Sequence, residues 1–227
     1  MASLSLAALY FVGIHVFVSG SSLRDRIAQK TGEQGFLGLF SVLSLIGMIW
    51  LVRAYGAAPA ILLWGPLLWF RPVALVLVLI AFVLVIVGLT TPSPTATGGE
   101  GVLDAGEPAT GILRVSRHPF LMGVALWGLT HLIASGDAAG TVLFGAMFVL
   151  ASIGPGLIDR KRARRFGETW PRFARATSVV PFVAIAQGRN RFVASEIGVW
   201  RLVAALVAYG LFLAFHAWMF GVDPMRF

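Results

Sequence analysis

The sequence contains six apolar stretches, each close to the roughly 20 residues that an α-helix needs to cross a bilayer core. They cover about 2–20, 36–55, 72–91, 118–135, 139–158 and 199–220. Because lipid offers the backbone no hydrogen bonds and no alternating barrel pattern is present, these stretches are expected to be helices. The sequence therefore predicts an all-α fold, a polytopic membrane helix bundle with about six transmembrane helices in one domain over residues 1–227.

The composition agrees with a chain embedded in a lipid bilayer. Of the 227 residues 58% are hydrophobic and 12% are charged, whereas soluble domains carry roughly 25% charged residues. The net charge of +8 would suit nucleic acid only on a basic solvated face, but the basic residues flank apolar stretches. We therefore expect the bilayer and no nucleic acid as a partner. With no cysteine, disulfides and thiolate chemistry are excluded.

Lysine and arginine are distributed unevenly over the connections between the apolar stretches. Segments 21–35, 92–117 and 159–201 hold 15 of the 18 basic residues. The positive-inside rule puts these segments in the cytoplasm. Both termini are then predicted to be periplasmic, in a multi-pass protein of a bacterial inner (plasma) membrane.

Four further segments are not simple connectors. Residues 60–70 are too short to span and read as interfacial, and 92–111 suit either a mobile lid or a plain solvated linker. Residues 160–177 predict a cytoplasmic interfacial helix in the headgroup region, and 178–186 predict a short interfacial or re-entrant piece. The apolar positions of the interfacial helix are Phe166, Trp170 and Phe173.

All four histidines lie in or at the edge of a predicted span: His15, His118, His131 and His216. Ionisable residues inside a membrane are costly and are functional candidates by default. A hydrogen bond between helices is the simplest role for each; a shared metal or haem site is the alternative. No acidic residue lies in the apolar part of a span, which disfavours hydrolytic zinc. Haem needs one or two histidines, an apolar slot and cations for its propionates.

The residues allow more than one haem arrangement. Gly123 and Trp127 share a helix face with His131 and could form a pocket wall. The helical rise puts His15 level with His118 and His131 level with His216. The propionate candidates are Arg24, Arg114 and Arg117.

Two blocks of sequence resemble the NnrU family of bacterial membrane proteins, over most of residues 1–180. The first is Gly13-Ile14-His15 with Leu23-Arg24-Asp25-Arg26; the second is Ser116-Arg117-His118-Pro119-Phe120 with Trp127-Gly128-Leu129 and His131. That family is associated with denitrification and nitric oxide reductase activity. It is similar to the plant 15-cis-zeta-carotene isomerases, haem b membrane enzymes that isomerise a cis double bond.

The resemblance implies haem b with His15 and His131 as its axial ligands. However, the helical rise places His15 and His131 at different depths in the membrane, so His118 and His216 stay as alternative ligands. It also implies either haem-dependent isomerisation of an apolar small molecule such as a polyene or an accessory role beside a respiratory nitric oxide reductase complex. The plant enzymes carry a cysteine where this chain has Gly128, so thiolate ligation is not expected.

A second resemblance suggests another class of function. Arg117-His118-Pro119, followed by Asp159, Phe166-Gly167, Trp170 and Pro181, looks like the isoprenylcysteine methyltransferases. It implies S-adenosylmethionine as the alternative cofactor, with its carboxylate at Arg117 and His118. Asp159 stands near where those enzymes use a glutamate.

Overall fold

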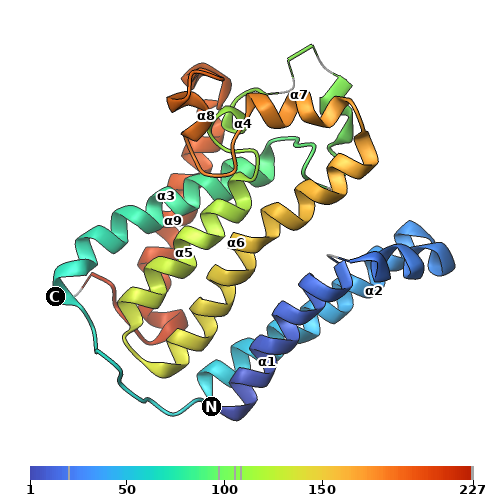
Figure 1. The fold of residues 1–227 in the computed structure, drawn as a ribbon. Coiled ribbons are helices and arrows are strands. Elements are labelled where there is room, and N and C mark those ends of the chain that lie inside the picture. The colour runs from blue at the N-terminus through green and yellow to red at the C-terminus, as the bar shows by residue number, and fades with distance from the viewer. Residues whose placement is uncertain (20, 97, 105, 108, 226–227) are drawn as a thin grey trace. The chain divides into compact units, whose positions relative to one another are not determined.

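A computed structural model describes residues 1–19, 21–96, 98–104, 106–107 and 109–225 (Figure 1). The described residues are helical or irregular, and the β-structure among them is an isolated bridge between Leu62 and Asp137. The chain divides into two compact units. Met1–Leu67 and Gly128–Leu157 form the first unit, and Leu68–Trp127 and Ile158–Phe227 form the second.

The helices confirm the predicted membrane bundle. The long ones are α1 (Ala2–Gly13) continued by the π-helix η1 (Ile14–Ser19), α2 (Ser22–Gly56), α3 (Arg71–Thr90), α5 (Pro119–Ser135), α6 (Ala138–Phe166) and α9 (Val199–Phe220). The short ones are η2 (Leu68–Phe70), η3 (Glu100–Asp104), α4 (Ile112–Val115), α7 (Thr169–Ala176), α8 (Val183–Ala186) and η4 (Ala194–Glu196). Five described helices are long and apolar enough to cross a membrane. The remaining predicted span, 118–135, corresponds to α5, which is a shorter apolar helix of 17 residues.

The long helices expose apolar side chains that water would not tolerate in such numbers. Within the apolar window of α9 only 6% of the residues are buried. Trp218 is 84% exposed and Val199 is 78% exposed. These faces are suited to contact with lipid chains, and the protein is a membrane protein.

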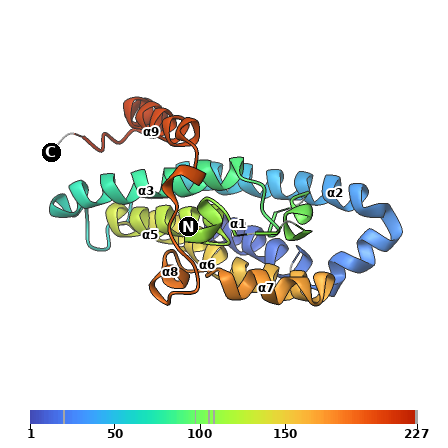
Figure 2. The same cartoon turned by 90° about the horizontal axis from the view of Figure 1, so that it is seen from above.

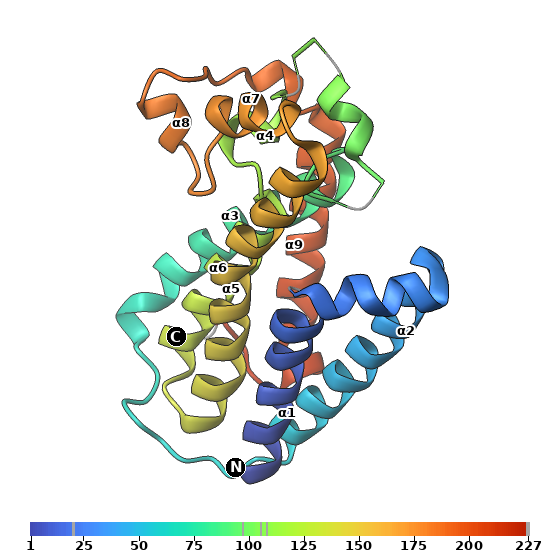
Figure 3. The same ribbon diagram turned by 45° about the vertical axis from the view of Figure 1, so that its right-hand side comes forward.

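In the first unit, α2 begins earlier than predicted and is bent (Figure 3). Gly32 interrupts it with φ 77° and ψ 164°, a conformation open essentially to glycine alone. The residues before Gly32 are charged, which is why the apolar pattern started only at Phe36. Residues 33–56 are long enough to span, at roughly 36 Å. Farther along α2, Gly47 admits the ring of Tyr10 from α1, since an added Cβ would lie 2.7 Å from Tyr10 Cε1.

The segment predicted to be interfacial after α2 is held to the turn between α5 and α6. The backbone N–H groups of Leu63, Trp64 and Gly65 all donate to the carbonyl of Gly136, at 2.9, 3.1 and 3.1 Å. The Trp64 indole donates to the Ile133 carbonyl at 3.0 Å. Gly136 has φ 65°, and a Cβ there would lie 2.2 Å from the Gly65 carbonyl oxygen. Two glycines therefore allow two backbones to meet.

In the second unit, α3 lies between α9 and the first half of α5 (Figure 2). Glycines allow α3 and α5 to approach closely. A Cβ on Gly88 would lie 2.8 Å from the Phe120 nitrogen, and one on Gly123 would lie 2.8 Å from the Ala81 carbonyl oxygen. The core of the unit joins α3 to the short helices α4 and α7 through Val87, Leu113 and Phe173.

The interfacial helix predicted over 160–177 is present in two parts. Residues 160–166 continue α6, Gly167 breaks the helix with φ 47°, and α7 follows. Trp170 is 4% exposed and Phe173 is fully buried. The apolar face of α7 is therefore covered by protein, because α4 and Leu103 of η3 pack against it in the same core. Within the described part of 92–111, Leu103 is thus packed in a core, which a plain solvated linker would not be.

Candidate functional site

His15 lies in η1, half-buried among aromatic rings. Its Nδ1 lies 2.7 Å from the carbonyl oxygen of Phe11. Since a carbonyl can only accept, Nδ1 carries the proton and Nε2 of the neutral ring keeps a lone pair. The ring centroids of Phe11 and Phe40 lie 4.5 and 5.1 Å away. π-Helical turns occur often at functional sites, and this one presents an oriented imidazole in an apolar setting.

An aromatic chain links His15 to a predicted propionate partner. Phe40 stacks on Phe36 at 5.7 Å between centroids, and the Arg24 guanidinium lies 5.2 Å from the centre of the Phe36 ring. Arg24 also pairs with Asp25 at 3.3 Å and with Glu33. The first unit therefore holds a histidine, an apolar surface and a cation in one cluster.

His131 also belongs to the first unit, where its ring packs 4.9 Å from that of Phe144 on α6. One turn earlier on α5, a Cβ added to Gly128 would lie 3.0 Å from the Phe148 nitrogen. The helices approach so closely here that a side chain at Gly128 has no room. His15 and His131 thus share a unit, although each packs against different aromatic residues.

The two predicted wall residues of the His131 pocket lie on α5 in the second unit. Gly123 faces α3, where a Cβ would lie 2.7 Å from a methyl carbon of Val85. The space beside Gly123 is therefore filled by α3. Trp127 is partly buried at the boundary of the unit.

His118 joins Arg117 on a single carboxylate in the second unit. Its side chain is 1% exposed, and its Nε2 lies 2.7 Å from Oδ1 of Asp159. Oδ2 of Asp159 accepts from Nη2 and Nε of Arg117, at 2.7 and 2.9 Å. His118 also borders a cavity of about 560 Å³ lined by residues 88–93, Thr95, Ala96, Gly98, Gly99, the start of α5 and Ile158. The structure therefore brings together the three polar residues of the second resemblance.

His216 lies near the end of α9 in the second unit. Its Nδ1 donates to the Val222 carbonyl at 2.7 Å, and its ring lies 4.9 Å from that of Phe220. The hydrogen bond fixes the segment after α9 against the last turn of the helix.

Arg114 is almost fully buried, with 3% of its surface exposed. Nε and Nη2 donate to the two carboxylate oxygens of Glu196 at 2.7 and 2.9 Å, and Nη1 donates to Asn190 at 2.9 Å. Nη2 also lies 2.9 Å from Glu107 Oε1. The hydrogen bond from Arg114 holds the pKa of Glu196 below its ordinary value, aided by the backbone N–H of Gly111.

The partners of Arg114 and Arg117 could not be found by spacing along the sequence. Glu196 lies 82 positions beyond Arg114, and Asp159 lies 42 beyond Arg117. Both arginines, predicted as propionate candidates, already bind carboxylates of the protein. Among the described residues no group of three or more histidine, aspartate or glutamate side chains could hold a metal ion.

The long apolar helices and the buried polar residues near their ends define the class as helical integral membrane proteins. The chain belongs to the NnrU family, since the family model described as "NnrU protein" matches residues 3–224. It is also similar to 15-cis-zeta-carotene isomerase, chloroplastic, of Arabidopsis thaliana, with 35% identity over 81 residues. The enzyme of the same name from Zea mays is 33% identical over 82 residues.

Each plant match covers 36% of this chain and 22% of the plant protein. The chain therefore spans only about a fifth of the length of these curated relatives. No solved structure matches the chain.

Proposed function

We propose that this protein binds haem b through His15 and His131 in a bacterial inner membrane and isomerises an apolar polyene. The observation that carries the proposal is the hydrogen bond from His15 Nδ1 to the Phe11 carbonyl, at 2.7 Å. Histidines that bind metals usually donate their other N–H in this way, which fixes the ring and strengthens the ligand nitrogen. The similarity to plant isomerases of a carotene supplies the substrate class.

The residues of the first unit fit the chemistry of haem. Phe11 and Phe40 provide aromatic surfaces beside His15. Arg24 lies beyond Phe36 and could pair with a propionate if it exchanged its present partners Asp25 and Glu33. Haem would supply a Lewis-acidic or redox-active iron. The chain's own groups would orient the imidazole, pair with the propionate and exclude water from an apolar substrate.

The absorption spectrum of the purified protein tests haem binding. We expect a Soret band after expression in haem-replete cells and purification in mild detergent. The band should be lost or shifted in His15→Ala and in His131→Ala, and kept in the matched variants His118→Ala and His216→Ala. The absence of a Soret band in the wild type would overturn the proposal. A band lost in His118→Ala or His216→Ala instead would move the ligands to those residues.

Catalysis is tested separately from binding with 15-cis-zeta-carotene, the polyene in the plant enzymes' name. We expect conversion of its central cis bond by the haem-loaded wild type in detergent. If the protein retains haem but does not convert the carotene, its role would be that of a haem carrier or an accessory factor. In that case we propose nitric oxide reductase as the partner, to be tested by co-purification from denitrifying cells.

A second candidate function rests on the Arg117–Asp159–His118 cluster beside the 560 Å³ cavity. We propose S-adenosylmethionine as the ligand there, with a methyl acceptor from the membrane. The carboxylate of S-adenosylmethionine would have to replace Asp159 as the partner of Arg117 and His118. A rise in the thermal unfolding midpoint with S-adenosylmethionine, lost in Arg117→Gln, supports this candidate. An unchanged unfolding midpoint of the wild type with S-adenosylmethionine excludes this candidate.

A further inference from the structure

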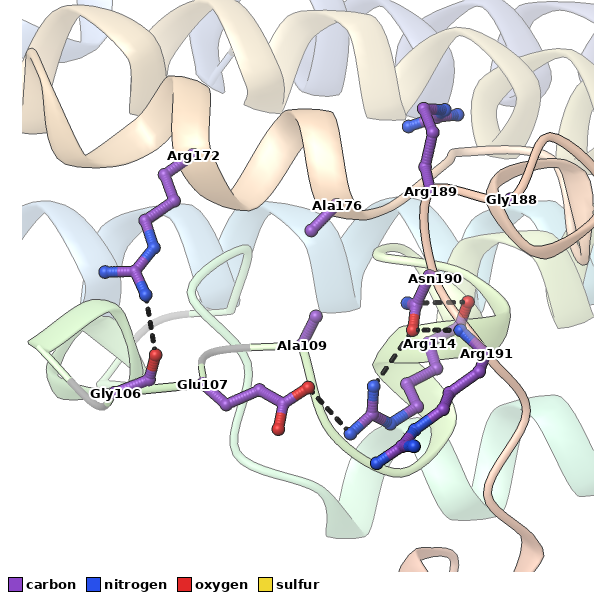
Figure 4. Close-up of a pocket in the computed structure, with 10 residues that line it drawn as sticks. All are labelled: Gly106, Glu107, Ala109, Arg114, Arg172, Ala176, Gly188, Arg189, Asn190 and Arg191. Carbon is purple, nitrogen blue, oxygen red and sulfur yellow. Dashed lines mark hydrogen bonds and ion pairs between the residues drawn. The ribbon is translucent and has the colours of Figure 1, made fainter.

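A second cavity, of about 460 Å³, lies beside the Arg114–Glu196 pair (Figure 4). Ligand sites typically have volumes of about 300–1,000 Å³. The charged side chains that line it are four arginines and one carboxylate: Arg114, Arg172, Arg189, Arg191 and Glu107. Both its volume and its charge suit an anionic group rather than an apolar polyene.

Arg114 is the buried anchor of this cavity. Glu196 and Asn190 hold three of its N–H groups from one side. Glu107 approaches from the loop and lies 2.9 Å from Nη2, with its own side chain 62% exposed (Figure 4). Because Glu196 and Asn190 keep Arg114 in place, Glu107 can leave without unpairing a buried charge. Its carboxylate occupies a position that another anion can take.

Two more arginines add positive charge around that position. Within the described residues the Arg191 guanidinium has no hydrogen bond or ion pair, and its field adds to the lowering of the Glu196 pKa. Arg172 donates to the Gly106 carbonyl at 2.8 Å, so its charge is not balanced by a carboxylate there. The Arg189 guanidinium is turned away toward the end of α7, where it donates to the Thr177 carbonyl at 2.8 Å.

Exposed aromatic residues flank the chain segment that forms one wall of the cavity. Phe182 and Phe192 are 53% and 50% exposed, with ring centroids 6.2 Å apart. Phe192 directly follows Arg191. Phe182 has φ 66°, which is strained for a residue with a side chain and points to a functional constraint. Arginines beside exposed aromatic rings are typical of protein surfaces at the lipid headgroup level.

We propose that this cavity binds the phosphate group of an anionic lipid headgroup and that Glu107 occupies the phosphate position when no lipid is bound. Arg114 and Arg191 donate to the phosphate oxygens, which form strong charge-assisted hydrogen bonds with guanidinium groups. Phe182 and Phe192 lie beside the acyl chains. The charge of Glu107 makes it a built-in competitor of the lipid.

Binding of dioctanoyl phosphatidylglycerol to the purified full-length protein, followed by native mass spectrometry, tests the proposal. Arg191→Gln should weaken binding about tenfold, as expected for one lost charged hydrogen bond. Glu107→Gln should tighten binding severalfold because the competing charge is removed. A gain of affinity cannot result from misfolding, so this variant keeps the test decisive.

Matched controls separate a site from general attraction to a basic surface. Arg164→Gln and Glu168→Gln make the same charge changes at exposed positions that do not line the cavity, and they should leave the affinity unchanged. Equal effects in the control and test variants would overturn the proposal, as would equal binding of dioctanoylglycerol, which lacks phosphate. Equal binding of glycerol 3-phosphate would instead assign the site to a soluble phosphate ester and overturn the lipid assignment.

Discussion

At the scale of single residues, the polar groups of this chain depend on partners far along the sequence. The sequence indicates Arg114 as a propionate candidate, but it does not indicate the partners Glu196 and Asn190, since no periodicity relates them to Arg114. Asp159 was singled out by a resemblance, and the structure adds that it binds Arg117 and His118 together. Burial, rather than residue type, distinguishes Arg114 from the exposed Arg164.

The Arg114–Glu196 pair should make stability depend on pH in the acid range. Because the folded-state pKa of Glu196 is lowered, the pair stabilises fully above the ordinary carboxyl pKa and is lost as the pH falls through the lowered one. Glu196→Gln should cost about 1–2 kcal/mol near neutral pH, because Arg114 keeps Glu107 and Asn190 as partners, and it should flatten this acid dependence. Thermal unfolding in detergent from pH 3 to pH 7 measures both effects. An unchanged acid slope in the variant would contradict the assignment.

Gly123 should be intolerant of side chains for a packing reason. Gly123→Leu is expected to destabilise the protein by about 1–3 kcal/mol, because Val85 and the Ala81 carbonyl fill the space. The control is Gly145→Leu on α6, where nothing lies within 4 Å of an added Cβ. Unfolding midpoints of both variants in the same detergent decide the matter; equal midpoints would show that α3 and α5 are not packed at Gly123.

At the scale of elements, the apolar pattern predicted the long helices well because lipid leaves the backbone no alternative. The predicted ends of α3 and α9 agree with the structure within one residue. The apolar pattern did not indicate the first part of α2, because the residues before Gly32 are largely polar and charged. It also did not indicate that the apolar face of α7 is covered by protein. In both places tertiary contacts or a single glycine decide the outcome.

The bend in α2 should depend on Gly32. Gly32→Ala is expected to straighten the helix or to destabilise it, since alanine avoids φ 77°. The chain has no cysteine, so spin labels at Gln29→Cys and Leu45→Cys report one distance without background. A straight helix would separate these positions by about 24 Å along its axis, more than the bent one. Gly38→Ala, at a position with open space, should leave the distance unchanged.

At the scale of the whole molecule, the charge distribution makes a prediction about topology. Single cysteines at Met225 and at Arg164 should react differently with a membrane-impermeant maleimide. We expect Met225→Cys to be labelled in intact spheroplasts and Arg164→Cys only after lysis, because the positive-inside rule predicts that the basic connections lie in the cytoplasm. Labelling of Arg164→Cys in intact spheroplasts and of Met225→Cys only after lysis would show that the orientation is opposite to the predicted one. Labelling of both in lysed membranes is the control for reactivity.

The contact between residues 63–65 and Gly136 has a consequence for biosynthesis. Its two sides are separated by more than 70 residues, with α3 and α5 between them. Helices enter a membrane before they associate, so we expect the three hydrogen bonds to Gly136 to form only after α5 has been inserted. The contact at the turn after α5 is therefore expected to be a late step in assembly. In a chain that ends before Gly136, residues 63–65 would lack these hydrogen bonds, and we expect this segment to be cleaved more readily by an added protease.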